Sequence, residues 1–152
     1  MSTPSSKKRK PRLVLDTNVW VSALIWRGPP ARIVKAAEEG KVFIITSEEI
    51  VNEINRTLAY PRLKRICEDA GVSRQQLIRI VLQVARLVEV KSKVHAVRED
   101  PADDKFLECA VDSKADYIVS GDEHLLKIGS YKRTRIVSVR QFLKILEKDQ
   151  AH

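Results

Sequence analysis

Short apolar runs rich in β-branched residues alternate with amphipathic helical patterns along most of the chain, and this alternation constrains the fold more than any other feature. Strands that alternate with helices predict a mostly parallel sheet whose two faces are covered. We therefore predict an α/β fold, a three-layer α/β/α sandwich with a mostly parallel central sheet. The expected strands span residues 13–15, 42–46, 88–90, 117–120 and 135–138. The expected helices span residues 19–25, 31–39, 47–58, 61–71, 77–88 and 139–148, and two more begin after Asp100 and near Leu125.

Local signals predict where several of these helices begin. The stretch Thr46-Ser47-Glu48-Glu49 has the form of a capping box, in which a hydroxyl and an acid three residues later satisfy free backbone N–H groups. The stretch Ser73-x-x-Gln76 has the same form. Proline is common at the first helical position, so Asp100 before Pro101 is predicted as an N-cap. Asp103 is then the third residue of that helix.

Much of the positive charge is concentrated at the N-terminus. The 152 residues include 28 Lys or Arg and 20 Asp or Glu, a formal net charge of +8. Residues 1–12 carry five of these net charges, which leaves about three on the rest of the chain. A basic balance favours a polyanionic partner, nucleic acid before a membrane surface. Residues 1–11 have no hydrophobic residue after Met1 and are predicted to be a disordered basic tail, whereas residues 12–148 are predicted to form one domain.

Cysteine usage and hydropathy indicate the compartment. Cys67 and Cys109 do not form a C-x-x-C motif, and we expect both to be buried, reduced thiols. The first residues contain no apolar segment of the kind that directs secretion, and no apolar run is long enough to cross a bilayer. We therefore expect a cytoplasmic protein without a membrane anchor.

Four acidic residues lie far apart in the sequence but near the predicted carboxyl ends of strands. Asp16 follows the first strand directly, and Asp122 follows a later strand after a Ser-Gly turn. Glu53 lies in the helix after the second strand, and Asp103 lies in the first turn of a helix. The carboxyl ends of parallel strands meet in one crevice, where like charges repel each other unless a cation lies between them. Ligands that are all oxygen predict Mg²⁺ or Mn²⁺.

The position of Glu53 is informative only together with the other acids. At about 100° per residue, Ile50, Val51, Ile54 and Leu58 form one apolar face of the helix, and Glu53 borders that face. Its carboxylate can therefore lean toward a cleft. On its own, the residue is equally typical of a solvated helix surface.

Two adjacent acids, Asp103 and Asp104, compete for one functional role. Asp103 lies in line with Phe106, Leu107 and Ala110, the expected inward face of the helix. Asp104 lies about 100° away around the axis. We therefore prefer Asp103 in the acidic cluster and expect Asp104 at most to orient a ligand or a bound water.

Three polar neighbours of these acids have less specific interpretations. Thr17 and Asn18 can hold the second oxygen of Asp16 or cap the following helix, and a purely structural N-cap remains an alternative for Asp16 and for Asn18. His124, two residues after Asp122, is expected at the surface.

Three other classes of α/β protein lack support in the sequence. A phosphatase of the haloacid dehalogenase type would need Asp-x-Asp-x-Thr after its first strand, and Asn18 stands in place of the second Asp, so the general acid is missing. A two-component receiver would place a Lys after its last strand. The last strand here ends with the sequence Ile136-Val137-Ser138-Val139, which contains no Lys. A dinucleotide-binding enzyme would need G-x-G-x-x-G, and the five glycines are dispersed.

Three stretches of the sequence resemble the PIN domain family, in which many members are toxin components of bacterial toxin–antitoxin pairs. They are LVLDTN at residues 13–18, SEEIVNEI at residues 47–54 and DPADDKFLECAVDSKADYIVSGDEHLL at residues 100–126. The resemblance extends from Arg12 to about Leu143. The third stretch is the most specific of the three.

The resemblance implies both a site and an activity. The acidic quartet of the family falls on Asp16, Glu53, Asp103 and Asp122, and its supporting hydroxyl and amide positions fall on Thr17, Asn18 and Ser120. The implied activity is that of a metal-dependent endoribonuclease acting on single-stranded RNA, with an antitoxin protein as partner.

One or two Mg²⁺ or Mn²⁺ ions can activate water, neutralise the phosphoryl group and stabilise the leaving oxygen, the three requirements of phosphodiester hydrolysis. We expect Asp16 and Asp122 to lie closest to the first ion. Glu53 and Asp103 can bind that ion, a second ion or the attacking water, and one carboxylate can accept a proton from the water. The sequence leaves these roles and the number of ions open.

Cations and exposed aromatic rings are the candidates for RNA binding. Basic residues that can contact the RNA backbone, or simply be solvated, are Arg27, Arg56, Arg62, Lys64 and Arg65. Tryptophan rings can stack on bases. A core position is the better interpretation for Trp20, while Trp26 stays open.

Alternative functions and assembly states also remain open. One alternative is a PIN-like module that binds RNA or protein without cleaving, and another is a housekeeping RNA-processing nuclease. In the apolar helix predicted at residues 77–88, Ile78 and Leu82 lie outside a single stripe, which is typical of a homodimer interface or of a deeply buried helix. The RNA target, the cleavage sequence and the antitoxin are not encoded in any recognisable pattern.

Overall fold

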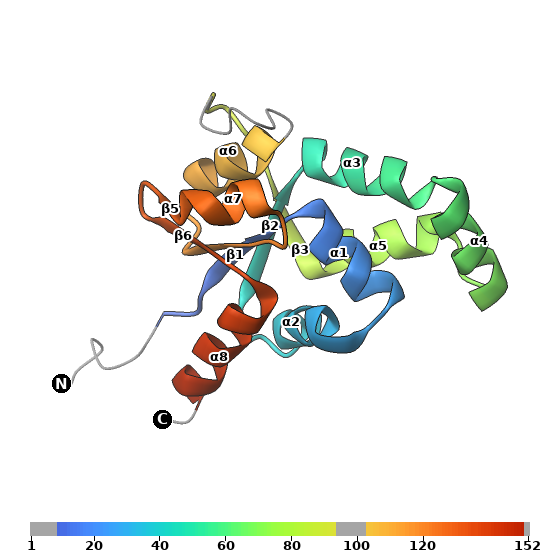
Figure 1. Ribbon diagram of the computed structural model, residues 1–152, viewed down its shortest axis with the longest axis horizontal. Coiled ribbons are helices and arrows are strands. Elements are labelled where there is room, and N and C mark those ends of the chain that lie inside the picture. The colour runs from blue at the N-terminus through green and yellow to red at the C-terminus, as the bar shows by residue number, and fades with distance from the viewer. Residues whose placement is uncertain (1–8, 94–102, 151–152) are drawn as a thin grey trace.

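A six-stranded, mostly parallel sheet forms the centre of the protein in a computed structural model that describes residues 9–93 and 103–150 (Figure 1). Its strands are β1 (Arg12–Leu15), β2 (Phe43–Ser47), β3 (Ala85–Val88), β4 (Tyr117–Val119), β5 (Ser130–Tyr131) and β6 (Thr134–Val137). Their order across the sheet is β3-β2-β1-β4-β6-β5. All neighbours are parallel except β5 and β6, which are antiparallel. The predicted mostly parallel sheet is confirmed.

Helices cover both faces of this sheet. They are α1 (Thr17–Ile25), α2 (Gly28–Glu38), α3 (Glu48–Leu58), α4 (Pro61–Ala70), α5 (Arg74–Val84), α6 (Asp104–Ser113), α7 (Glu123–Ile128) and α8 (Val139–Gln150). Figure 1 shows α6 and α7 on one side of the strands and α1, α2 and α5 on the other. Helix α6 contacts β1 to β4, and α8 packs against α2. The three-layer arrangement agrees with the prediction.

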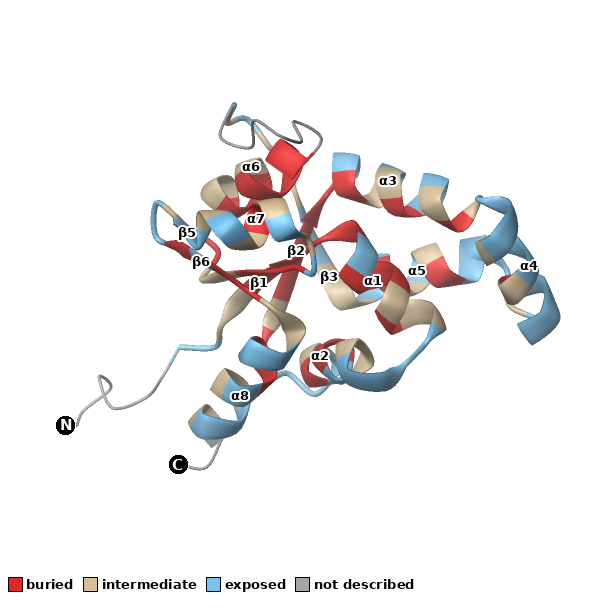
Figure 2. Cartoon of the chain, in the orientation of Figure 1, coloured by how far each residue is buried: buried red, intermediate tan, exposed pale blue. Residues whose placement is uncertain are grey.

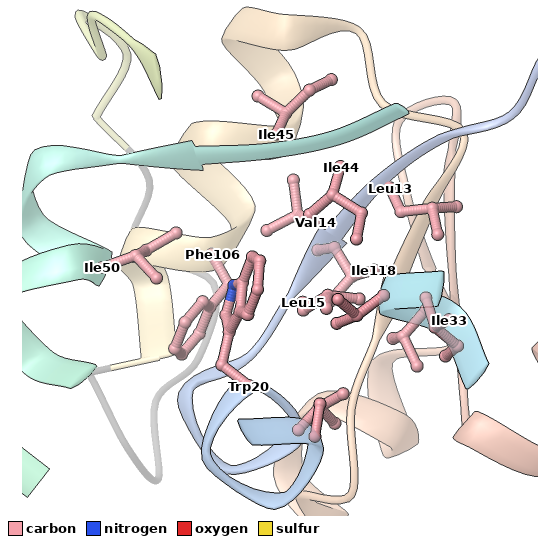
Figure 3. Packing of buried hydrophobic residues seen from close by; sticks show 14 of the residues in the cluster. Leu13, Val14, Leu15, Trp20, Ile33, Ile44, Ile45, Ile50, Phe106 and Ile118 are labelled. Atoms are coloured by element: carbon pink, nitrogen blue, oxygen red, sulfur yellow. The ribbon is translucent and has the colours of Figure 1, made fainter. Parts of the chain in front are cut away.

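The core surrounds β1, the central strand. Leu13, Val14 and Leu15 have no solvent exposure, because β1 is flanked by strands on both edges and by helices on both faces. Figure 3 shows the labelled core residues around this strand. Each such side chain contributes about 1.5–3 kcal/mol through burial. Trp20 is also fully buried, which confirms the predicted core position.

The sheet order reverses at β1, and this reversal positions the candidate site. Strands β2 and β3 lie on one side of β1, and β4 and β6 lie on the other. The carboxyl ends of β1 and β4 therefore adjoin at the topological switch point, where open α/β sheets bind ligands. The backbone N–H of Asp16 donates to the carbonyl of Val119 at 3.1 Å, which continues the pairing just past the end of β1.

The start of α3 differs by one residue from the predicted capping box. Ser47, not Thr46, is the N-cap, and its side chain accepts a hydrogen bond from the backbone N–H of Ile50 at 3.3 Å. Thr46 belongs to β2, where its buried hydroxyl has no hydrogen-bond partner within the described residues. Strand pairing with β3 therefore extends β2 to Ser47, one residue further than predicted. The capping box of Ser73 and Gln76 at α5 is confirmed.

The boundary between α5 and β3 was predicted wrongly. The helix ends at Val84 rather than Val88, because Ala85 takes up an extended backbone and the following residues pair with β2. The apolar residues up to Leu87 fit helical spacing, so periodicity alone does not reveal the change. The alternative of a deeply buried helix is also wrong, since Leu82 is half exposed on α5.

Two predicted segments extend beyond the described residues. Asp100, the predicted N-cap, lies outside them, and α6 itself begins at Asp104. Asp103 directly precedes α6 with right-handed helical angles (φ −81°, ψ −10°) and makes no side-chain capping bond to that helix. Asp103 is therefore not the third residue of α6.

Only the last part of the predicted tail is described. Residues 1–8 lie outside the described part of the chain. Arg9 forms an ion pair with Asp116 at 2.6 Å, and the carbonyl of Pro11 accepts from the N–H of Phe43 at 2.9 Å. The segment next to β1 is thus held by the sheet.

The prediction that both cysteines are buried and free of a disulfide is confirmed. Cys67 and Cys109 are buried and unbonded to each other. Burial raises the pKa of the Cys109 thiol to about 12, which keeps it protonated and unreactive. None of the helices within residues 9–93 and 103–150 is long and apolar enough to span a bilayer.

Candidate functional site

Asp16 is a buried carboxylate held at the carboxyl end of β1. Its Oδ1 accepts from the backbone N–H of Val19 at 2.8 Å, which caps α1. Its Oδ2 accepts from the hydroxyl of Ser120 at 2.5 Å and from the N–H of Gly121 at 3.3 Å. Burial is the main cause that raises the pKa of Asp16; these hydrogen bonds lower it, and the nearby charge of Asp122 raises it further. Burial and the charge of Asp122 therefore disfavour the ionised form of Asp16, and its hydrogen bonds favour that form.

Ser120 links the ends of β1 and β4. Its hydroxyl donates to Asp16 and accepts from the backbone N–H of Asp122 at 2.9 Å. Asp122 in turn caps α7, since its Oδ1 accepts from the N–H groups of His124 at 2.7 Å and Leu125 at 3.2 Å. The Ser120 hydroxyl thus joins the carboxylate of Asp16 to the backbone of Asp122 at the ends of β1 and β4.

Asp103, Asp122 and His124 bring potential metal ligands together. One ligand atom from each residue lies within 4.8 Å of the others. Asp103 is buried at the start of α6, and the other two belong to the N-terminus of α7. The Nδ1 of His124 lies 3.8 Å from Asp122 Oδ1 and is buried without a hydrogen-bond partner among the described residues. The side chain of His124 is 39% exposed, while its Nδ1 is buried.

Glu53 lies on α3 and contacts the residue that follows Asp16. The hydroxyl of Thr17, the residue after Asp16, donates to Glu53 Oε1. The ammonium of Lys105 donates to Glu53 Oε2 at 3.2 Å. Of the predicted quartet, only Asp103 and Asp122 belong to the group with His124, and Asp16 and Glu53 lie outside it.

The supporting residues divide by burial. Thr17 and Ser120 are buried and contact the acids directly. Asn18 is exposed, and the N-cap of α1 is Asp16, so the predicted alternative of Asn18 as the cap is wrong. Asp104 is as buried as Asp103, with each residue 8% exposed, so burial does not separate the two.

The predicted RNA-binding cations are all exposed but lie at different distances from the acids. Arg56 follows Glu53 by less than one turn of α3, whereas Arg62 lies on α4, which projects from the far end of the domain (Figures 1 and 2). Arg27 follows α1, whose 1.5 Å rise per residue puts it roughly 15 Å beyond Asp16. Trp26 beside it is 54% exposed. Arg56 is the nearest of the proposed contacts.

The sequence gives little signal for two residues of the site, Lys105 and His124. A Lys in a charged helical turn is usually solvated, so nothing in the sequence indicates the burial of Lys105. His124 is predicted at the surface rather than as a ligand, and the structure leaves its side chain 39% exposed but groups it with Asp103 and Asp122. The spacing Asp122-x-His124 is the only sequence signal for His124, and it is weak.

A hollow of about 680 Å³ opens beside the acidic centre rather than over it. It is lined in part by Ser47, Glu48, Glu49, Asn52 and Glu108. Asp16, Asp103 and Asp122 do not line this hollow. We therefore define the site by the carboxylates at the switch point and not by the hollow.

The chemistry of the donor set fits a divalent cation. Ligands bonded to one Mg²⁺ or Mn²⁺ ion at about 2.1 Å lie no more than about 4.2 Å apart, so separations of up to 4.8 Å need to close by roughly half an ångström. Carboxylate oxygens suit Mg²⁺ and Mn²⁺, and an imidazole favours Mn²⁺ of the two. Within residues 9–93 and 103–150, Asp103 and Asp122 with His124 form a group able to hold such an ion.

An open sheet that gathers carboxylates at its switch point defines the class: an α/β domain with an acidic, oxygen-donor centre. Within this class, the chain belongs to the PIN domain family, whose family model matches residues 12–124. The fold is therefore a nuclease fold. A similar protein, the uncharacterized protein MJ1680 of Methanocaldococcus jannaschii, is 29% identical over 126 residues, which cover 80% of this chain and 77% of that protein.

Proposed function

We propose that this protein is a metal-dependent endoribonuclease that hydrolyses phosphodiester bonds of single-stranded RNA. One observation carries the proposal: Asp103, Asp122 and His124 converge to within 4.8 Å beside Asp16, which shares the hydroxyl of Ser120 with the backbone of Asp122. The PIN domain family gives the arrangement its context. The acids Asp16, Glu53, Asp103 and Asp122 form the catalytic centre in this proposal.

Each residue of the centre has a role that follows from its contacts. Asp103 and Asp122 would hold one Mg²⁺ or Mn²⁺ ion together with His124, and Asp16 is joined to Asp122 through Ser120. A bound ion supplies Lewis acidity at the phosphoryl group and at the attacking water. Ser120 keeps Asp16 and Asp122 in register, and one of the carboxylates accepts the proton of the water. Asp104 lies beside this group as a supporting residue.

RNA approaches the centre through its phosphates. The net charge of +8 favours association with a polyanion. Arg56 is the nearest predicted contact, and Arg27 and Arg62 extend the basic surface along the helices. Trp26 beside Arg27 is exposed, and its ring is the candidate for stacking on a base.

The test of the substrate uses purified full-length protein with Mn²⁺ and matched oligonucleotides. We expect internal cleavage of labelled single-stranded RNA, with little cleavage of the same sequence as single-stranded DNA or as duplex RNA. The Asp122→Asn variant, purified in parallel, controls for contaminating nuclease. Mn²⁺ binding without cleavage of any RNA would support the non-catalytic alternative instead.

In the cell, we propose that the protein acts as the toxin of a toxin–antitoxin pair. The support is the PIN domain family, in which this context is typical. A housekeeping nuclease is the alternative. A short adjacent reading frame whose product binds the protein and blocks RNA cleavage would support the toxin role.

A homodimer is the other proposed assembly. Leu82 on α5 is half exposed and is a candidate contact between two copies of the chain.

A further inference from the structure

Lys105 is an unusual residue for the start of a helix. Its side chain is only 6% exposed, and its ammonium lies 3.2 Å from Glu53 Oε2. Lysine is rarely buried unless it is paired. The first turn of a helix also disfavours a cation, because the helix dipole is positive there. A buried cation at this position is therefore held by the surrounding anions rather than by the helix.

The hydrogen bonds of Glu53 define the position of the Lys105 ammonium. One carboxylate oxygen accepts from Thr17, the residue after Asp16, and the other accepts from Lys105, two residues after Asp103. The ammonium therefore lies between the α3 side of the centre and the start of α6. The three residues grouped as potential metal ligands do not include Glu53.

We propose that the Lys105 ammonium is a built-in cation at Glu53, takes the place of a second divalent ion, and limits the acidic centre to one ion. This inference rests on the proposed function, because it assumes that the centre binds a divalent metal. It fixes the number of ions that the sequence leaves open, and it makes Lys105 a positioning residue for Glu53.

The geometry explains why both cations would not share Glu53. A divalent ion bound to Glu53 Oε2 at about 2.1 Å would lie no farther than about 5.3 Å from the Lys105 nitrogen, which is 3.2 Å from that oxygen. Like charges at that distance repel strongly in a partly buried site. The other oxygen of Glu53 is engaged by Thr17. A second ion therefore needs Lys105 to withdraw or to lose its charge.

The experiment counts Mn²⁺ ions bound per chain in full-length protein, from the electron paramagnetic resonance signal of free Mn²⁺ during titration. We expect one tight site in the wild type and in Lys105→Arg, and two sites in Lys105→Met, where Glu53 is released. The double variant Lys105→Met/Glu53→Gln should return to one site, because the anion that binds the second ion is gone. Exposed Lys144 on α8 provides the matched control, and Lys144→Met should bind one ion.

Two sites in the wild type, no site in the wild type, or one site in folded Lys105→Met would overturn the inference. If Lys105→Met does not fold by circular dichroism, Lys105→Gln replaces it with the same expectation of two sites. Failure of the ribonuclease proposal is distinguishable. One ion in the wild type and two in Lys105→Met, without any RNA cleavage, would retain the built-in cation and reject the nuclease proposal. RNA cleavage by a wild type that binds two ions would retain the nuclease proposal and reject the built-in cation.

Discussion

Asp16→Asn is expected to lower the rate of RNA cleavage by at least about two orders of magnitude, the scale of one lost electrostatic contribution in a catalytic site. The substitution keeps the shape of the side chain and removes one charge. The remaining amide oxygen can still accept from Val19 and cap α1, as Oδ1 of Asp16 does at 2.8 Å. Single-turnover cleavage of labelled RNA under saturating protein measures the loss.

The same variant should fold at least as well as the wild type. Burial raises the pKa of Asp16 above its ordinary value of 3.8, so the native state binds this proton more tightly than the unfolded state does. Stability therefore falls as pH rises through these pKa values. Without metal, Asp16→Asn should be more stable than the wild type at neutral pH, and the difference should vanish below pH 3.8, where both states are protonated. Chemical denaturation across this pH range measures the difference.

Asp69→Asn, on the exposed surface of α4, is the matched control and should change neither cleavage nor stability. Near-normal cleavage by correctly folded Asp16→Asn would remove this residue from the catalytic centre.

Asp103→Asn is expected to reduce both cleavage and Mn²⁺ affinity far more than Asp104→Asn. The two residues are adjacent at the start of α6 and equally buried. The interaction of each carboxylate with the helix dipole stabilises the helix by about 0.3–1 kcal/mol. Only Asp103 is grouped with Asp122 and His124. We expect a loss of at least about 100-fold in cleavage for Asp103→Asn. We expect a loss of about tenfold or less for Asp104→Asn, as for a residue that orients a ligand.

Calorimetric titration with Mn²⁺ provides the readout that does not depend on activity. The pair of variants controls for helix stability, because both remove one charge from the same helical terminus. The reverse order of losses would place Asp104 in the quartet and Asp103 beside it.

The central part of the fold was predictable because its signals are local and mutually consistent. The run at residues 13–15 is apolar on both faces, as a central parallel strand requires, and it forms β1. The acids after β1 and β4 were predicted to meet because parallel strands align their carboxyl ends. Asp16 and Asp122 do adjoin there through Ser120.

The features that were not predictable depend on contacts distant in sequence. The change from α5 to β3 at Ala85 follows from pairing with β2, which helical spacing does not record. Strand β5 has two residues, too few to show a periodicity. The burial of Lys105 depends on Glu53, 52 residues earlier, and the grouping of His124 with Asp103 joins residues 21 positions apart.

The most direct measurement of the central claim is cleavage of single-stranded RNA before and after metal removal. Protein treated with EDTA and freed of the chelator should show no cleavage, and added Mn²⁺ should restore it, with Mg²⁺ as the comparison. The Asp122→Asn variant should stay inactive at every metal concentration that restores the wild type. Undiminished cleavage in EDTA by wild-type protein, with the Asp122→Asn preparation inactive and contamination thereby excluded, would contradict a metal-dependent centre.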